Sequence, residues 1–95
     1  MKGGIKAIAT LFSNRGNAYR KLGQLDKAVE DLSKALELEP QEVPMLSTRA
    51  GIYEAQGEYE KAVADCKKAL DLDPDKKNAK EILARCEAAL KERKR

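Results

Sequence analysis

The chain has 95 residues, enough for one domain with a single core and too few for two independent ones. Hydrophobic residues make up 42% of it, charged residues 37% and aromatic residues 4%, a composition typical of a thin helical layer. With no histidine and only two cysteines, it excludes Ser/His and Cys/His catalytic pairs, four-ligand zinc sites and CxxC redox motifs. We expect Cys66 and Cys86 to be buried, reduced thiols, which favours an intracellular protein.

The first four residues hold paired glycines ahead of any periodic pattern, so residues 1–4 are predicted to form a flexible N-terminus. From about residue 5 to 22, apolar residues then recur at the spacing of a helix: Ile8, Leu11, Phe12, Ala18, Tyr19 and Leu22. Gly23 supplies the left-handed residue that ends helices at low cost. This segment is the first predicted helix.

A second helix is predicted to start beside Asp26, whose carboxylate can cap it. Its apolar stripe has steps of three and four residues, and Pro40 ends it because proline cannot donate to a continuing helix. Since the turn between the two helices is very short, they must be antiparallel neighbours. The pair is therefore a helical hairpin.

The same pattern returns 34 residues later, with Tyr19, Gly23, Ala28, Ala35 and Pro40 matched by Tyr53, Gly57, Ala62, Ala69 and Pro74. Repeats of about this length indicate stacked helical pairs. Small residues recur where two helices are predicted to cross closely, as Gly16 with Ala50. The repeat thus predicts a second hairpin, with Pro44 at its start.

Arg15 and Arg49 recur at the same offset, as do Asp31 and Asp65. A repeated base in one helix and a repeated acid in its partner predict an ion pair inside each hairpin. The alternative is that the charges face solvent and recur only because the two copies share an ancestor.

Residues 77–93 break the pattern. They have one apolar stripe and one charged face and lack the glycine stop, so we expect a capping helix that covers the end of the stack. Four bases in residues 91–95 could contact RNA or an anionic membrane. Bases at the negative end of a helix explain this tail better, so neither nucleic acid nor a membrane is an expected partner.

With these positions placed, the chain resembles the tetratricopeptide repeat family. If Ala9 is repeat position 1, Gly16, Tyr19, Gly23 and Pro40 fall at positions 8, 11, 15 and 32, and the second copy from Val43 has their counterparts. The resemblance implies an all-α solenoid of helical hairpins with five helices. It places repeat one at residues 9–42, repeat two at 43–76 and the capping helix at 77–93, within a single domain at 5–95.

The resemblance also implies a concave groove, lined by the first helix of each repeat, that binds an extended peptide or a protein terminus. The family's groove positions fall in the first copy on Thr10, Ser13, Asn14, Asn17, Arg20 and Lys21. In the second copy they fall on Pro44, Ser47, Thr48, Gly51, Glu54 and Ala55. Arg85 of the cap is placed at the far end. The first set is polar and basic. It predicts a protein or peptide partner, and an acidic peptide is one candidate.

One subfamily holds the C-terminal carboxylate of heat-shock chaperones with Lys, Asn and Arg at fixed positions. Asn14 matches the asparagine, but Pro44 and Thr48 occupy the slots of the lysine and arginine. Because this clamp is incomplete, a general adaptor role is favoured over binding of a chaperone tail.

Two other hypotheses remain open: a designed or minimal scaffold without a dedicated ligand, and a chain that self-associates through its open ends, although a monomer is favoured. No enzyme is predicted, because the glycines fit no phosphate loop and the carboxylates alternate with lysines on helix surfaces. We expect no cofactor and no metal, and a cytoplasmic location.

Overall fold

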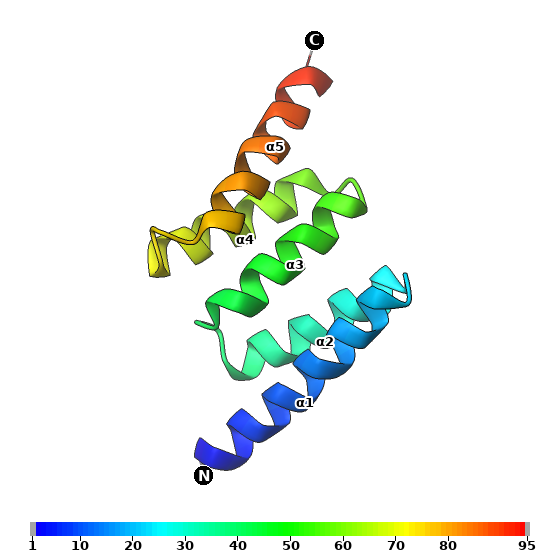
Figure 1. Cartoon of the computed structure of the whole chain (residues 1–95), viewed down its shortest axis with the longest axis vertical. Coiled ribbons are helices and arrows are strands. Elements are labelled where there is room, and N and C mark those ends of the chain that lie inside the picture. The colour runs from blue at the N-terminus through cyan, green and yellow to red at the C-terminus, as the bar shows by residue number, and fades with distance from the viewer. Residues whose placement is uncertain (1, 95) are drawn as a thin grey trace.

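The computed structural model describes residues 2–94, so Met1 and Arg95 lie outside the described part. Five helices follow one another there: α1 (Lys2–Lys21), α2 (Leu25–Leu38), α3 (Val43–Ala55), α4 (Tyr59–Leu72) and α5 (Lys77–Arg93). α1 packs against α2 and α3 against α4, α2 joins the hairpins by packing on α3, and α5 covers α4 and part of α3. Figure 1 shows these layers stacked along the long axis of a body measuring 50 × 29 × 18 Å.

The predicted helix stops are confirmed. Gly23 and Gly57 have φ angles of 79° and 76°, the left-handed region in which glycine has no steric penalty. The amides that follow them, of Gln24 and Glu58, donate to tyrosine carbonyls five residues back at 2.9 and 2.8 Å. Each hairpin therefore turns through a glycine-based helix end. Pro44 lies in the first turn of α3, as predicted.

Two local predictions differ from the structure. α1 begins at Lys2, three residues before the predicted start at residue 5, since Gly3 and Gly4 lower helix propensity without blocking the hydrogen-bond ladder. The expected cap by Asp26 is wrong: the N-cap residue of α2 is Gln24, with no side-chain cap. Asp26 lies within the first turn, where its charge favours the helix dipole, and it accepts a hydrogen bond from Gln56 at 2.7 Å.

Small residues allow the helices of each hairpin to approach closely. Ala28, Ala50 and Ala62 are fully buried. A Cβ atom at Gly16 would meet the Leu32 side chain at 3.1 Å and the Ala28 carbonyl oxygen at 3.2 Å, closer than ordinary contact. The predicted close crossing is thus confirmed.

Both cysteines are buried free thiols, as expected. They belong to the core cluster between α3, α4 and α5. Burial raises the pKa of Cys66 to about 12 and also raises that of Cys86. Both therefore act as small core residues that carry no charge at neutral pH.

The predicted ion pairs are present in both hairpins. The Arg15 guanidinium donates to Asp31 at 2.7 and 2.9 Å, and Arg49 donates to Asp65 at 2.7 Å through two nitrogens. The forked geometry makes these strong pairs. Arg49 also donates to Ser33 of the preceding hairpin at 3.0 Å, so it ties the two repeats together.

The last helix covers the stack as predicted. α5 buries Ala79, Ile82 and Cys86, while Lys80 and Glu87 stay exposed. Near the basic C-terminus, Arg93 donates to Glu60 of α4 at 3.2 Å. Within residues 2–94, no helix combines the length and the apolar character needed to cross a membrane.

Candidate functional site

The first helices of the repeats and the cap share one side of the stack. α1, α3 and α5 lie in front of α2 and α4 in Figure 1. An open hollow of about 380 Å³ lies between them and takes residues from all three, together with the start of α2: Arg20, Leu25, Ser47, Thr48, Gly51, Ile52, Ala55, Asn78 and Ile82. This hollow is the part of the predicted groove that the structure forms.

The second copy supplies most of the hollow's wall. Thr48, Gly51 and Ala55 line it, as their groove positions predicted. Ser47 lines it too, but it is only 2% exposed and its hydroxyl donates to the Pro44 carbonyl oxygen at 3.1 Å. Ser47 therefore contributes to the floor, while Thr48 is half-buried.

Glu54 and Arg85 are paired with each other. The Arg85 guanidinium donates to the Glu54 carboxylate at 2.7 and 3.0 Å, which joins α3 to α5, and these hydrogen bonds raise the pKa of Arg85. The charge of Arg85 is thus balanced within the chain. Glu81 of α5 also acts electrostatically on Arg85, so the α5 side of the groove has both signs of charge.

On α1, the predicted residues separate into two sets. Arg20 lines the hollow. Ser13 and Asn17 are half-buried, and Asn14 and Lys21 are exposed, but all four lie outside the lining of the hollow. The structure therefore brings Arg20 together with Ser47 and Thr48, and places the other α1 residues along the helix beside them.

Four lining residues were not predicted as groove residues: Leu25, Ile52, Asn78 and Ile82. Asn78 and Ile82 reach the hollow from the first turns of α5. Counting the cap as a third first helix from Lys77 puts them at positions 2 and 6, by the same count that put Arg85 at position 9. The repeat count therefore indicates Asn78 and Ile82 as well as Arg85.

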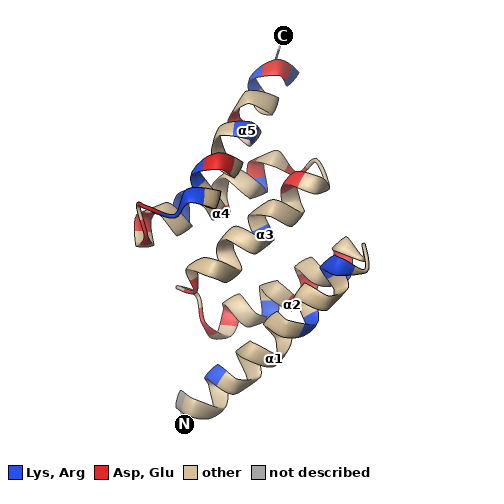
Figure 2. Ribbon diagram, viewed as in Figure 1, with Lys and Arg blue, Asp and Glu red and all other residues tan. Residues whose placement is uncertain are grey.

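Charge is unevenly divided between the helices. α1 contains no Asp or Glu and has Arg20 and Lys21 in its last turn. Figure 2 shows α1 with basic segments and no acidic one, whereas acidic segments appear on the other four helices. The groove is therefore basic at α1 and nearly balanced at α5.

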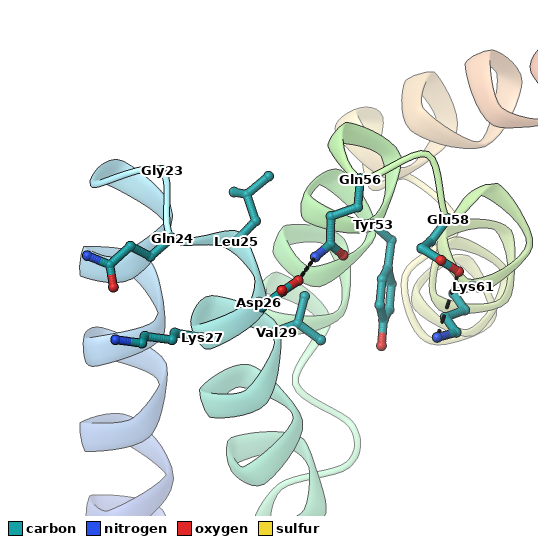
Figure 3. A pocket seen from close by; sticks show the side chains of 10 residues that line it. All are labelled: Gly23, Gln24, Leu25, Asp26, Lys27, Val29, Tyr53, Gln56, Glu58 and Lys61. Carbon is teal, nitrogen blue, oxygen red and sulfur yellow. Dashed lines mark hydrogen bonds and ion pairs between the residues drawn. The ribbon is translucent and has the colours of Figure 1, made fainter.

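A second and larger hollow, of about 810 Å³, lies between the two hairpin turns and contains none of the predicted site residues (Figure 3). Its polar groups are largely paired: Asp26 accepts from Gln56, and Glu58 lies 3.7 Å from Lys61. Lys27 points away from it, over the ring of Tyr19. The arrangement leaves no convergent set of free polar groups.

A comparison with curated proteins finds no match. Among solved structures, the chain is similar to the second TPR of Spaghetti (RPAP3) bound to the HSP90 peptide SRMEEVD, with 25% identity and a TM-score of 0.87, over 92% of this chain and 81% of that one. It is also similar to the Arabidopsis OM64 TPR domain, with 23% identity and a TM-score of 0.89, over 95% of this chain and 74% of that one.

The Sgt2 TPR domain from Aspergillus fumigatus is 29% identical, with a TM-score of 0.82, over 90% of this chain and 57% of that one. All three structures are TPR domains, which serve as protein–protein interaction modules. The model of the tetratricopeptide repeat family matches residues 9–42 and 44–76, most of the chain. The chain therefore belongs to the tetratricopeptide repeat family.

Proposed function

We propose that this interaction module binds an extended peptide in the groove between α1, α3 and α5. The observation that carries the proposal is the hollow itself. It combines an apolar floor that includes Ile82 with polar groups on three helices, Arg20, Thr48 and Asn78. A pocket of mainly apolar surface with a few convergent polar groups is the usual form of a binding site.

The proposed ligand carries acidic side chains near its α1 end. Arg20 can pair with a carboxylate, while Thr48 and Asn78 can hydrogen-bond the peptide backbone. Lys21 and Asn17 lie farther along α1 and can extend these contacts. At the α5 end, where Glu54 already neutralises Arg85, neutral residues fit better. A volume of about 380 Å³ is near the lower limit for a ligand pocket, which suits a few side chains.

The second TPR of Spaghetti (RPAP3), with its bound HSP90 peptide, supplies a suitable acidic probe, SRMEEVD. In this chain, however, Pro44 and Thr48 stand where a carboxylate clamp needs Lys and Arg. We therefore propose recognition of acidic side chains and backbone, without dependence on a free C-terminal carboxylate.

The test is a titration of ¹⁵N-labelled chain with SRMEEVD, with the same peptide amidated at its C-terminus, and with SRMQQVN, in which amides replace the three side-chain carboxylates. Amide shifts are expected at Arg20, Thr48 and Asn78. Both acidic peptides should bind within about twofold of each other, and the amide-substituted one about tenfold more weakly, the effect of one lost charge-assisted hydrogen bond.

Arg20→Glu should weaken binding of the acidic peptides by about tenfold or more. The matched control is Lys67→Glu, which makes the same charge change on an exposed position of α4. Absence of shifts would contradict the proposal and favour a scaffold without a dedicated ligand. A strong preference for the free carboxylate would instead support the chaperone-tail alternative.

A further inference from the structure

One side of α1 is uncovered, at the N-terminal end of the stack. Its apolar residues Ile8, Leu11, Ala18 and Leu22 are exposed, with Leu11 and Leu22 at 68% and 70%. In a helix of 3.6 residues per turn, Leu11, Ala18 and Leu22 fall on one stripe. We call these three residues and Ile8 the outer face of α1.

The corresponding face of α3 packs against a helix, α2, and this shows what kind of surface the outer face of α1 fits. Counting 34 residues on, Leu11, Ala18 and Leu22 correspond to Met45, Ile52 and Gln56. Ile52 is 2% exposed and packs with Ala28 and Leu32 of α2, and Met45 packs against the same cluster. Gln56 donates to Asp26, the acid in the first turn of α2.

The arginines of the two helices differ in the same way: the one on α3 contacts the preceding helix, and the one on α1 has no preceding helix to contact in the described part of the chain. Arg49 donates to Ser33 of α2 in addition to its own Asp65, and its side chain is 20% exposed. Arg15, its counterpart on α1, pairs only with Asp31 among the described residues and is 57% exposed. The counterpart of the Arg49 nitrogen that donates to Ser33 is Nη1 of Arg15, which makes neither of the two hydrogen bonds to Asp31.

The other end of the stack is closed in a different way. α5 exposes Lys80, Glu87 and Lys91, and of its apolar residues only the small Ala84 and Ala88 are exposed. Within residues 2–94, α2 is the only helix that packs extensively on α1 (Figure 1). An uncovered apolar face at one end, and a polar face at the other, mark α1 as the end that takes a partner.

Charge indicates what that partner is. α1 has no acid, and its bases Arg15 and Lys21 lie beside the outer face, four residues after Leu11 and three after Ala18. Two copies meeting through this face would bring like charges together with no acid on either α1 to separate them, which opposes a symmetric dimer. An acidic helix has no such conflict and can also supply Arg15 with a second acceptor, the counterpart of Ser33 beside Arg49.

We propose that the outer face of α1 binds an acidic amphipathic helix whose apolar stripe consists of small residues and leucine, like the side of α2 that faces α3. The helix lies across Leu11, Ala18 and Leu22. A hydroxyl or carboxylate on it accepts from Arg15, as Ser33 accepts from Arg49. This surface is distinct from the groove and does not depend on the proposed peptide ligand.

The probe is a capped synthetic peptide of residues 24–40, which is α2 itself, with five carboxylates and two lysines. Added to the ¹⁵N-labelled full chain at up to millimolar concentration, it should cause saturable shifts at Leu11, Ala18 and Leu22. A control peptide with Ala28→Gln and Leu32→Gln keeps the charge and loses the stripe, so it should cause no saturable shift.

Leu11→Gln should weaken binding about tenfold, the value of one buried leucine. Its matched control, Leu72→Gln, changes an exposed leucine at the end of α4 and should leave binding unchanged. Circular dichroism checks that both variants fold, as their exposure predicts.

Shifts confined to groove residues, or no shift at millimolar peptide, would overturn the proposal.

Sedimentation tests whether a second copy of the chain occupies the outer face instead. A wild-type dimer that Leu11→Gln converts to monomer would show that a second copy occupies this face, which also overturns it. A wild-type monomer at every concentration is the expected result. Thr48→Ala with Asn78→Ala, which removes the groove's hydrogen-bonding side chains on α3 and α5 without changing α1 or its charge, should weaken SRMEEVD and leave the helix affinity unchanged, so failure of either proposal can be told from failure of the other.

Discussion

α1 and α3 begin the two repeats and share a pattern of packing residues, yet their surroundings differ. α3 lies between α2 and the cap, so its outer face is buried by Ala28 and Leu32. α1 has the same face open, with Leu11 and Leu22 exposed. Place in the stack, more than residue type, decides whether a position of the repeat stabilises the fold or is free to bind.

The largest effect is expected at Ile52. Ile52→Ala removes a fully packed side chain between the hairpins and should lower the free energy of unfolding by about 2–5 kcal/mol. Leu11→Ala, on the open face of α1, should change it by less than about 0.5 kcal/mol. Chemical denaturation measures both. Equal losses would mean that the outer face of α1 is already covered.

The second comparison concerns the two ion pairs. Asp65→Asn leaves Arg49, only 20% exposed, without its carboxylate and should cost about 1.5–3 kcal/mol. Asp31→Asn should cost less, because Arg15 is 57% exposed and can turn to water. Chemical denaturation of the two variants shows which one loses more free energy of unfolding. Asp71→Asn, on the exposed side of α4, is the control. The reverse order would show that exposure does not set the value of the pair.

Two glycines differ in how much space surrounds them, Gly16 at the crossing of α1 and α2 and Gly51 on α3. Gly16→Val should destabilise the first hairpin by about 1–3 kcal/mol, since a Cβ atom there already meets Leu32 and the Ala28 carbonyl. Gly51→Ala meets only the end of Ile82 at 3.7 Å and should stabilise α3 by about 0.5–1 kcal/mol. Thermal unfolding of both variants checks the signs. A neutral Gly16→Val would contradict the close crossing.

The smallest effect is a pH dependence. Hydrogen bonds from Arg15 lower the pKa of Asp31 in the folded chain, so the stability it contributes is present above the unfolded pKa of about 3.9 and is lost as pH falls through the folded pKa. Wild type should therefore lose more stability than Asp31→Asn as the pH is lowered from about 5 to 2. Parallel pH profiles of the two would contradict this assignment.

Recurrence explains what the sequence could predict. The Arg49–Asp65 pair, the glycine stops and the close crossings each occur twice, so a single offset revealed them. The Glu54–Arg85 pair occurs once, across 31 residues between a repeat and the cap, and no periodic signal marks it. Leu11 and Leu22 matched a helical stripe, but only the stacking order shows that nothing in the described chain covers them.

The groove was predicted in part for the same reason. Thr48, Gly51 and Ala55 follow from repeat positions alone. Ser47 follows from them too, but its hydroxyl bonds to the Pro44 carbonyl, so it leaves little surface to a ligand. Asn78 and Ile82 fall at groove positions only when the cap is counted as a third first helix, and the packing of the cap against α3 brings them to the hollow.

The central claim is that α1 carries two separate surfaces, one on the groove and one on the outer face. The most direct test is one NMR titration of the wild-type chain with SRMEEVD, followed by the residue 24–40 peptide in the same sample. The account predicts that the first probe moves Arg20, Thr48 and Asn78, that the second moves Leu11 and Leu22, and that neither displaces the other. Competition between the probes, or one shared set of shifts, would contradict it.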